Sequence, residues 1–260
     1  MADSDVVRVR LLGELHVEAS GGLVRSTDMP GRQGRLVLAR LALSQFPVPR
    51  DELASIVWPD ALPKSWERDL SAVVSKLRAL LTGVGFDDAI ANAFGCYQLK
   101  PFRVRVDILE ASEWLEGGET AWRNGDVAHA QIQGDTAVEM FRREFFAGED
   151  SEWIAAQRVA LSQLRYRALA LATDAHRARG MFPEANRYAR RMIEEDPYRE
   201  QGYAALVRVL LAAGDRASAL QAYQRARSFL IDELGVSPSD ALEAAYFEAL
   251  NADPEPAEAA

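Results

Sequence analysis

The sequence predicts an α+β domain over residues 1–106, followed by an all-α domain over residues 107–250. In the first part, short segments of alternating apolar and polar residues surround three segments with helical periodicity. From Ile108 the periodicity is helical almost to the end of the chain, and a glycine followed five residues later by an alanine recurs there. This recurrence indicates repeated pairs of antiparallel helices.

The first domain is expected to contain a small sheet, three helices and a β-hairpin, in that order. Strands are expected at residues 6–11, 15–17 and 23–25. Helices are expected at residues 32–45, 51–57 and 64–81, with prolines in the turns between them. The hairpin is expected at residues 90–99, and residues 101–107 are expected to form the junction between the domains.

The segment 64–81 has one apolar face and one face that is small, hydroxylated and basic. On a helical wheel, the apolar face carries Leu70, Val73, Val74, Leu77, Leu80 and Leu81. The opposite face carries Ser65, Arg68, Ala72, Ser75, Lys76 and Ala79. Small residues let a helix enter the major groove of DNA, where Arg, Lys and Ser bind base edges or phosphates. An ordinary amphipathic surface helix has the same composition, so the wheel alone leaves both interpretations open.

A helix of this kind followed by a β-hairpin is the order of elements in a winged helix-turn-helix, a DNA-binding fold. We therefore predict that the first domain binds double-stranded DNA. The residues predicted to contact DNA are Lys64, Ser65, Arg68, Ser71, Ala72, Ser75, Lys76, Arg78 and Asn92. Arg78 lies on the flank of the helix, where a phosphate contact is more natural than a base contact. Asn92 would bind the minor groove or a phosphate, or would serve only as a turn residue.

The charge is distributed unevenly between the two domains. The chain of 260 residues has a net charge of −9. Residues 1–106 hold 14 Lys and Arg against 12 Asp and Glu, a net charge of +2, whereas residues 107–260 hold 16 against 27, a net charge of −11. A local basic face matters more for DNA binding than the total charge. The small positive charge predicts modest affinity for each subunit, with help from a second subunit on the DNA.

The all-α domain is expected to be tetratricopeptide-like. The glycine and alanine pairs are Gly125/Ala130, Gly180/Ala185 and Gly214/Ala219. The last two glycines are 34 residues apart, which is the tetratricopeptide period. Glycine lets the chain turn between helices, and alanine lets the second helix pack closely on the first. The pair Asp196-Pro197 is expected to end a helix, and the tail 251–260 is expected to be disordered.

No residues are arranged as a catalytic, metal or cofactor site. His16, His129 and His176 lie far apart, with the last two expected on helix surfaces, and no phosphate-binding or nucleophile motif occurs. An enzyme is therefore not expected. A single cysteine, Cys96, fits the reducing cytoplasm, and no apolar run approaches the roughly 20 residues of a membrane-spanning helix. We expect a cytoplasmic protein located at the bacterial nucleoid, with no membrane partner.

The order of motifs over residues 6–250 resembles the SARP family, the Streptomyces antibiotic regulatory proteins. The stretches that carry the resemblance are RQGRLVLARL (32–41), VPRDELASIVWPD (48–60), SAVVSKLRALL (71–81), GCYQL (95–99), VDILEASEW (106–114) and DELGVSP (232–238). These proteins join an OmpR-type winged helix to a bacterial transcriptional activator domain. The resemblance implies that residues 64–81 form the recognition helix, with Arg68, Ala72 and Lys76 nearest the base edges.

The resemblance also implies the partners. Relatives bind direct repeats side by side, activate secondary-metabolite gene clusters, and contact RNA polymerase through the loop before the recognition helix. In this chain that loop is Pro59, Asp60, Ala61, Leu62 and Pro63. One feature departs from the family, because OmpR-type wings often present an arginine to the minor groove and residues 90–94 contain none.

The neutral wing and the small positive charge support an alternative function. In this alternative the tetratricopeptide-like array is a protein-interaction adaptor, and the winged helix no longer binds DNA. The basic and small outer face of the segment 64–81 opposes it.

Overall fold

The computed structural model describes residues 6–100 and 104–252, which fall into two compact units. The first unit comprises Met1–Ser112 together with Met140–Leu161, and the second comprises Glu113–Glu139 together with Ser162–Ala260. The sequence placed the division at residue 106. The difference arises because a segment distant in sequence returns to the first unit, and local periodicity carries no signal for such a return.

The first unit contains, within the described residues, a mixed sheet in the order β3-β2-β1-β7 and a small antiparallel sheet in the order β4-β6-β5. The strands of the mixed sheet are β1 (Val7–Arg10), β2 (His16–Ala19), β3 (Gly22–Arg25) and β7 (Val104–Val106). Those of the small sheet are β4 (Val48–Pro49), β5 (Ile90–Ala93) and β6 (Cys96–Leu99). A short 3-10 helix, η2 (Ser26–Asp28), leads from β3 to the helices.

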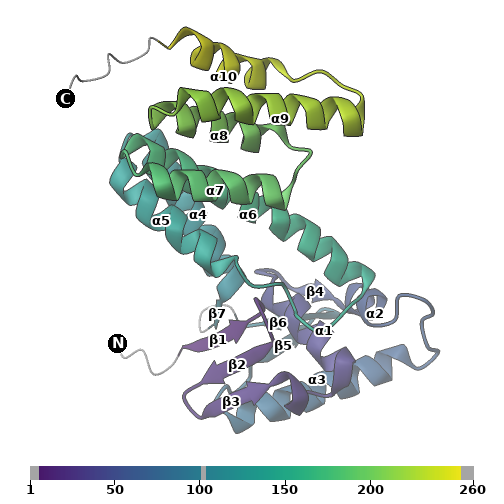
Figure 1. Ribbon diagram of the computed structural model, residues 1–260. Coiled ribbons are helices and arrows are strands. Elements are labelled where there is room, and N and C mark those ends of the chain that lie inside the picture. The colour runs from purple at the N-terminus through teal and green to yellow at the C-terminus, as the bar shows by residue number, and fades with distance from the viewer. Residues whose placement is uncertain (1–5, 101–103, 253–260) are drawn as a thin grey trace. The chain divides into compact units, whose positions relative to one another are not determined.

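The helices of the first unit pack against one another through apolar stripes. They are α1 (Gly31–Ala42), α2 (Arg50–Val57) and α3 (Trp66–Gly83) (Figure 1). Leu36 of α1, Leu53 of α2 and Leu77 of α3 are all fully buried. The expected order of sheet, helices and hairpin is therefore confirmed, and so is the predicted α+β winged helix-turn-helix class.

Several expected boundaries were wrong by a few residues. The first helix ends at Ala42 rather than residue 45, because the Ser44 hydroxyl donates to the Phe46 carbonyl and turns the chain. The expected junction at 101–107 is in part a strand, since Val104 and Val106 of β7 pair in parallel with Val7 and Val9 of β1. Residues 101–103 lie outside the described residues.

The segment that returns to the first unit is Met140–Leu161, called the returning segment below. It hydrogen-bonds to the loop after β1. The Phe146 amide donates to the Leu11 carbonyl at 2.8 Å, and the Gly13 amide donates to the Glu144 carbonyl at 2.7 Å. Leu12 and Phe145 form an isolated antiparallel bridge. Because Phe145 and Phe146 are also 2% and 1% exposed, the segment is part of the hydrophobic core of this unit.

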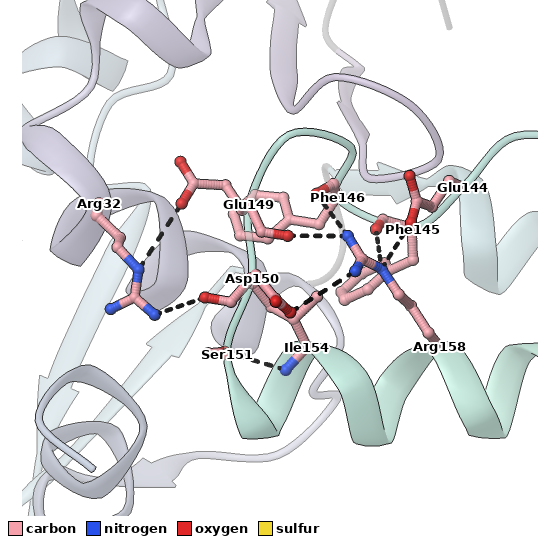
Figure 2. A network of polar contacts seen from close by, with 9 residues as sticks. All are labelled: Arg32, Glu144, Phe145, Phe146, Glu149, Asp150, Ser151, Ile154 and Arg158. Carbon is pink, nitrogen blue, oxygen red and sulfur yellow. Dashed lines mark hydrogen bonds and ion pairs between the residues drawn. The ribbon is translucent and has the colours of Figure 1, made fainter. Parts of the chain in front are cut away.

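Three arginines hold the returning segment in place, and Figure 2 shows two of them, Arg32 and Arg158. Arg158, from α6 (Glu152–Ala178), donates from Nη2 to the Glu149 carbonyl at 2.8 Å and from Nε to the Phe145 carbonyl at 3.2 Å. Arg32 of α1 donates to the Asp150 carbonyl at 2.8 Å, and both Arg32 and Arg35 pair with the Glu149 carboxylate. The carbonyl groups of Phe145, Glu149 and Asp150 thus accept hydrogen bonds from guanidinium groups.

A buried carboxylate joins the sheet to the first helix of the chain's second half. Asp107, the first residue of α4 (Asp107–Arg123), is 4% exposed. It accepts hydrogen bonds from the amides of Leu11 and Ile108, each at 2.9 Å, and of Leu12, also at 2.9 Å. Three backbone donors thus satisfy the oxygens of this buried side chain.

The second unit is helical throughout the residues that the structure describes. It contains parts of α4 and α6, together with α5 (Val127–Met140), α7 (Phe182–Glu195), α8 (Glu200–Ala212), α9 (Arg216–Leu234) and α10 (Asp240–Asn251). The helices α8, α9 and α10 lie side by side (Figure 1). Asn251 is the last residue of α10, and residues 253–260 of the expected tail lie outside the described residues.

The repeated glycines and alanines occupy the positions that the sequence predicted for them. Gly125, Gly180 and Gly214 have φ angles of 77°, 72° and 78°, which favour glycine, and each lies in the turn between two helices. Ala130, Ala185 and Ala219 are each fully buried. The tetratricopeptide-like helix pairs are thereby confirmed. The interval between the first two glycines is longer than one repeat because it contains the returning segment and α6, which has 27 residues.

The Asp107→Ala substitution is expected to lower the free energy of unfolding by about 3 kcal/mol, because it leaves buried amide groups without an acceptor. Urea denaturation followed by circular dichroism measures this change. Glu113→Ala, on an exposed site of the same helix, is the control. A loss below about 1 kcal/mol for Asp107→Ala would show that the amides find other partners.

The Glu149→Gln substitution is expected to lower the free energy of unfolding by about 1–2 kcal/mol, since the arginines that it pairs with would remain partly buried. The matched control is Asp150→Asn. Its side chain is 88% exposed against 16% for Glu149, and its pair with Arg158 is expected to contribute little. Equal effects of the two substitutions in a thermal melt would contradict this ranking.

Candidate nucleic-acid interface

The outer face of α3 has the composition that the helical wheel predicts. Leu70, Val73, Val74, Leu77 and Leu81 are buried, and Leu80 is half-buried. The exposed residues of α3 are Glu67, Arg68, Ser71, Ala72, Ser75, Lys76, Ala79, Thr82 and Gly83. The Arg68 side chain is 83% exposed and lies 3.7 Å from the Asp69 carboxylate. The exposed face therefore carries mostly small residues, with Arg68 and Lys76 as its cations and Glu67 as an anion in the first turn.

The first two residues predicted for this helix precede it. Lys64 and Ser65 lie in a turn, and Ser65 is the N-cap residue of α3. The Ser65 hydroxyl donates to the Asp69 carboxylate at 2.7 Å, and the Ser65 carbonyl accepts from the Asp69 amide at 3.0 Å. The predicted start at residue 64 was wrong because these contacts fix Ser65 in a capping conformation. Lys64 is exposed, whereas the Ser65 hydroxyl already has a partner.

Arg78 attaches the hairpin to α3. Its Nε donates to the Ile90 carbonyl of β5 at 2.9 Å, and its guanidinium carbon lies 5.9 Å from the centre of the Tyr97 ring. The Ser71 hydroxyl lies 3.4 Å from the Tyr97 hydroxyl and donates to the Glu67 carbonyl at 2.7 Å. Two of the residues predicted to contact DNA thus have structural partners.

Arg50, which the sequence analysis did not single out, attaches the other side of the hairpin. Its guanidinium carbon lies 5.0 Å from the centre of the Tyr97 ring, and its Nη2 donates to the Asn92 side-chain oxygen at 3.1 Å. The Arg50 amide donates to the Gly95 carbonyl at 3.1 Å. Tyr97 therefore lies against two guanidinium groups, an arrangement with favourable cation–π attraction. Asn92 is exposed, but its side-chain oxygen is bound within the unit.

The loop between α2 and α3 is largely exposed. Pro59, Asp60, Ala61 and Leu62 are exposed, with Leu62 at 51%, and Pro63 is half-buried. Trp58, at the end of α2, is half-buried and anchors the loop. The loop thus presents a short polar and apolar surface beside the start of α3.

The described residues contain no cluster of three or more metal-ligating side chains. His129 is exposed, but His176 is 2% exposed, so its expected place on a helix surface was wrong. Its Nδ1 lies 2.8 Å from the Ala172 carbonyl, and its ring lies 5.2 Å from the ring of Tyr188. His176 thus fills the core between α6 and α7. None of the described helices is long and apolar enough to cross a membrane.

Residues 106–250 match the family model of the bacterial transcriptional activator domain, which covers more than half of the chain. The chain belongs to the SARP family. The resemblance that the sequence motifs indicated is thereby confirmed.

Relatives of this SARP chain are named regulatory proteins. AfsR of Streptomyces coelicolor is 27% identical over 98% of this chain, which spans only 25% of AfsR. DnrI of Streptomyces peucetius is 25% identical over 95% of this chain and 93% of its own length. The structure of Mycobacterium tuberculosis EmbR, in complex with a low-affinity phosphopeptide, superposes with a TM-score of 0.86 and 26% identity. That match covers 94% of this chain and 65% of EmbR.

The arginines of α3 are expected to differ in their effect on stability. Arg78→Ala should lower the free energy of unfolding by about 1–2 kcal/mol, because the hydrogen bond to Ile90 and the contact with Tyr97 are lost. Arg68→Ala, at an exposed site of the same helix, should change it by less than about 0.5 kcal/mol. Parallel thermal melts measure both effects. A larger loss of stability for Arg68→Ala than for Arg78→Ala would show that Arg68 has the structural role that we assign to Arg78.

Proposed function

We propose that this chain is a sequence-specific DNA-binding transcriptional activator that places α3 in the major groove. The observation that carries this proposal is the outer face of α3, where Arg68, Ala72, Ser75 and Lys76 are exposed within a unit of winged-helix topology. Alanine at the centre of this face lets the backbone approach the bases. Arg68 and Lys76 can reach guanine edges on either side of it.

The contacts within the unit refine the set of residues that we assign to DNA. Arg68, Ala72, Ser75 and Lys76 face the bases or phosphates, and Lys64 approaches the backbone beside the start of α3. Ser65, Ser71, Arg78 and Asn92 hold α3 and the hairpin in place, and they contact phosphates at most through the atoms left exposed. Separating these roles makes the proposal testable with single substitutions.

The partners follow from the low charge of the first domain and from the family. We assign direct repeats as the DNA site, with two copies of the chain bound side by side, because a second copy adds phosphate contacts that one copy lacks. The exposed loop Pro59–Pro63 is assigned to RNA polymerase. The regulated genes are assigned to a bacterial secondary-metabolite cluster, which places the chain in the cytoplasm at the nucleoid.

Selection of fragments from a random DNA pool, followed by fluorescence anisotropy titrations, tests this function. Enrichment of a direct repeat with half-sites about one helical turn apart is expected, with affinity that falls steeply as salt rises. Absence of binding at low salt would contradict DNA recognition. It would favour the adaptor alternative, in which the helical unit binds a protein partner.

The double variant Arg68→Ala/Lys76→Ala is expected to bind the selected DNA at least roughly tenfold more weakly, because contacts to base edges are lost. The steepness of its salt dependence should also fall if either side chain contacts a phosphate. The matched control is Arg225→Ala/Arg227→Ala, which removes the same charge from exposed sites of α9 in the other unit. Equal losses for the two double variants would show that only overall charge matters.

A further inference from the structure

The tip of the β5–β6 hairpin carries a phenylalanine that no other side chain covers. Phe94 is 103% exposed, the highest value among the large hydrophobic residues that the structure describes. The preceding residues Ala91, Asn92 and Ala93 are also exposed. A lone exposed aromatic ring contributes nothing to the core, so Phe94 has no packing role in the described structure.

The backbone at Phe94 is also unfavourable for this residue. Ala93 pairs with Cys96, which leaves Phe94 and Gly95 as a two-residue turn, and their φ angles are +51° and +75°. Such turns favour Asn or Asp followed by Gly, because a bulky side chain with positive φ is strained. A residue that is both strained and exposed is a typical sign of a functional contact.

The hairpin rests on positive charge that no carboxylate neutralises. Within the described part of the chain, neither Arg50 nor Arg78 forms an ion pair, whereas Arg35 and Arg40 of α1 each pair with a glutamate. The hairpin itself, residues 90–99, contains no Lys or Arg. The hairpin thus combines an apolar tip with two cationic side chains that pack against Tyr97. This combination suits a polyanion whose groove can accept an apolar group.

The dimensions of the hairpin fit the minor groove beside the α3 site. From Ile90, which Arg78 holds against α3, the strand β5 rises about 13 Å to the tip. The minor groove lies about half a helical turn, roughly 17 Å, from the centre of the adjoining major groove. The Arg50 amide holds the turn through Gly95, so that the tip is supported on both sides.

We propose that Phe94 is an apolar wedge that enters the minor groove and partly unstacks one base step. This proposal rests on the DNA binding proposed for α3. The ring of Phe94 would take the place of the arginine that OmpR-type wings often present to the minor groove. Apolar side chains inserted in this way bend DNA toward the major groove. Pyrimidine–purine steps such as TA and CA unstack most easily, so the wedge favours sites with such a step beneath the wing.

The variant Phe94→Asn tests the wedge, because asparagine suits the turn and removes the ring. We expect unchanged or higher thermal stability, roughly tenfold weaker binding to the selected DNA, and an unchanged salt dependence, since no phosphate contact is lost. Energy transfer between dyes at the ends of the DNA should show a smaller bend. The matched control is Phe46→Asn, which removes a ring that is 75% exposed in the loop before β4, and it should leave all four properties unchanged.

Each other outcome overturns the proposal in a recognisable way. Wild-type affinity or an unchanged bend in Phe94→Asn would exclude the wedge, while loss of binding in Arg68→Ala/Lys76→Ala would still support the α3 site. A lower melting temperature in Phe94→Asn would assign the ring a structural role. Failure of the wild-type chain to bind any DNA would overturn the proposed function itself and the wedge with it.

Discussion

Asp107 accepts hydrogen bonds from the amides of Leu11, Leu12 and Ile108, and so ties the end of β1 to the start of α4. These contacts place β7 beside β1 and leave the loop after β1 in position for the returning segment. The mixed sheet of the first unit therefore depends on a carboxylate at the start of the region that matches the bacterial transcriptional activator domain. A buried polar side chain is tolerated there because backbone donors satisfy its oxygens.

The returning segment makes the first unit composite. Its main chain bonds to Leu11 and Gly13, its aromatic residues enter the core, and Arg32, Arg35 and Arg158 satisfy or neutralise its polar groups. The helices α4 and α6 each begin in the first unit and end in the second. A chain cut at residue 106 would lack part of the core of its own winged helix. The family model, which begins at residue 106, therefore follows sequence relationship rather than physical independence.

The arginines of α1, α2 and α3 divide into three roles according to their partners. Those of α1 are neutralised by carboxylates and stabilise the fold, as Arg40 does with Glu52. Arg50 and Arg78 lie against Tyr97 and hold the hairpin, and neither forms an ion pair within the described residues. Arg68 is exposed on the face of α3. A low net charge is thus compatible with a locally basic surface, because the neutralised arginines lie elsewhere.

The sequence by itself determined the features that depend on residues close along the chain. The apolar stripe of α3 and the glycine and alanine pairs such as Gly214 and Ala219 follow from local periodicity or from the φ angles that glycine favours. Tertiary structure alone decided the parallel pairing of β7, the return of Phe145 and Phe146 to β1, the burial of His176 and the structural use of Arg78. In each of these cases the partner groups lie on other elements, some about a hundred residues away, as Leu11 and Asp107 do. Local patterns show which face of an element is apolar or charged, but not which distant donor or acceptor will meet it.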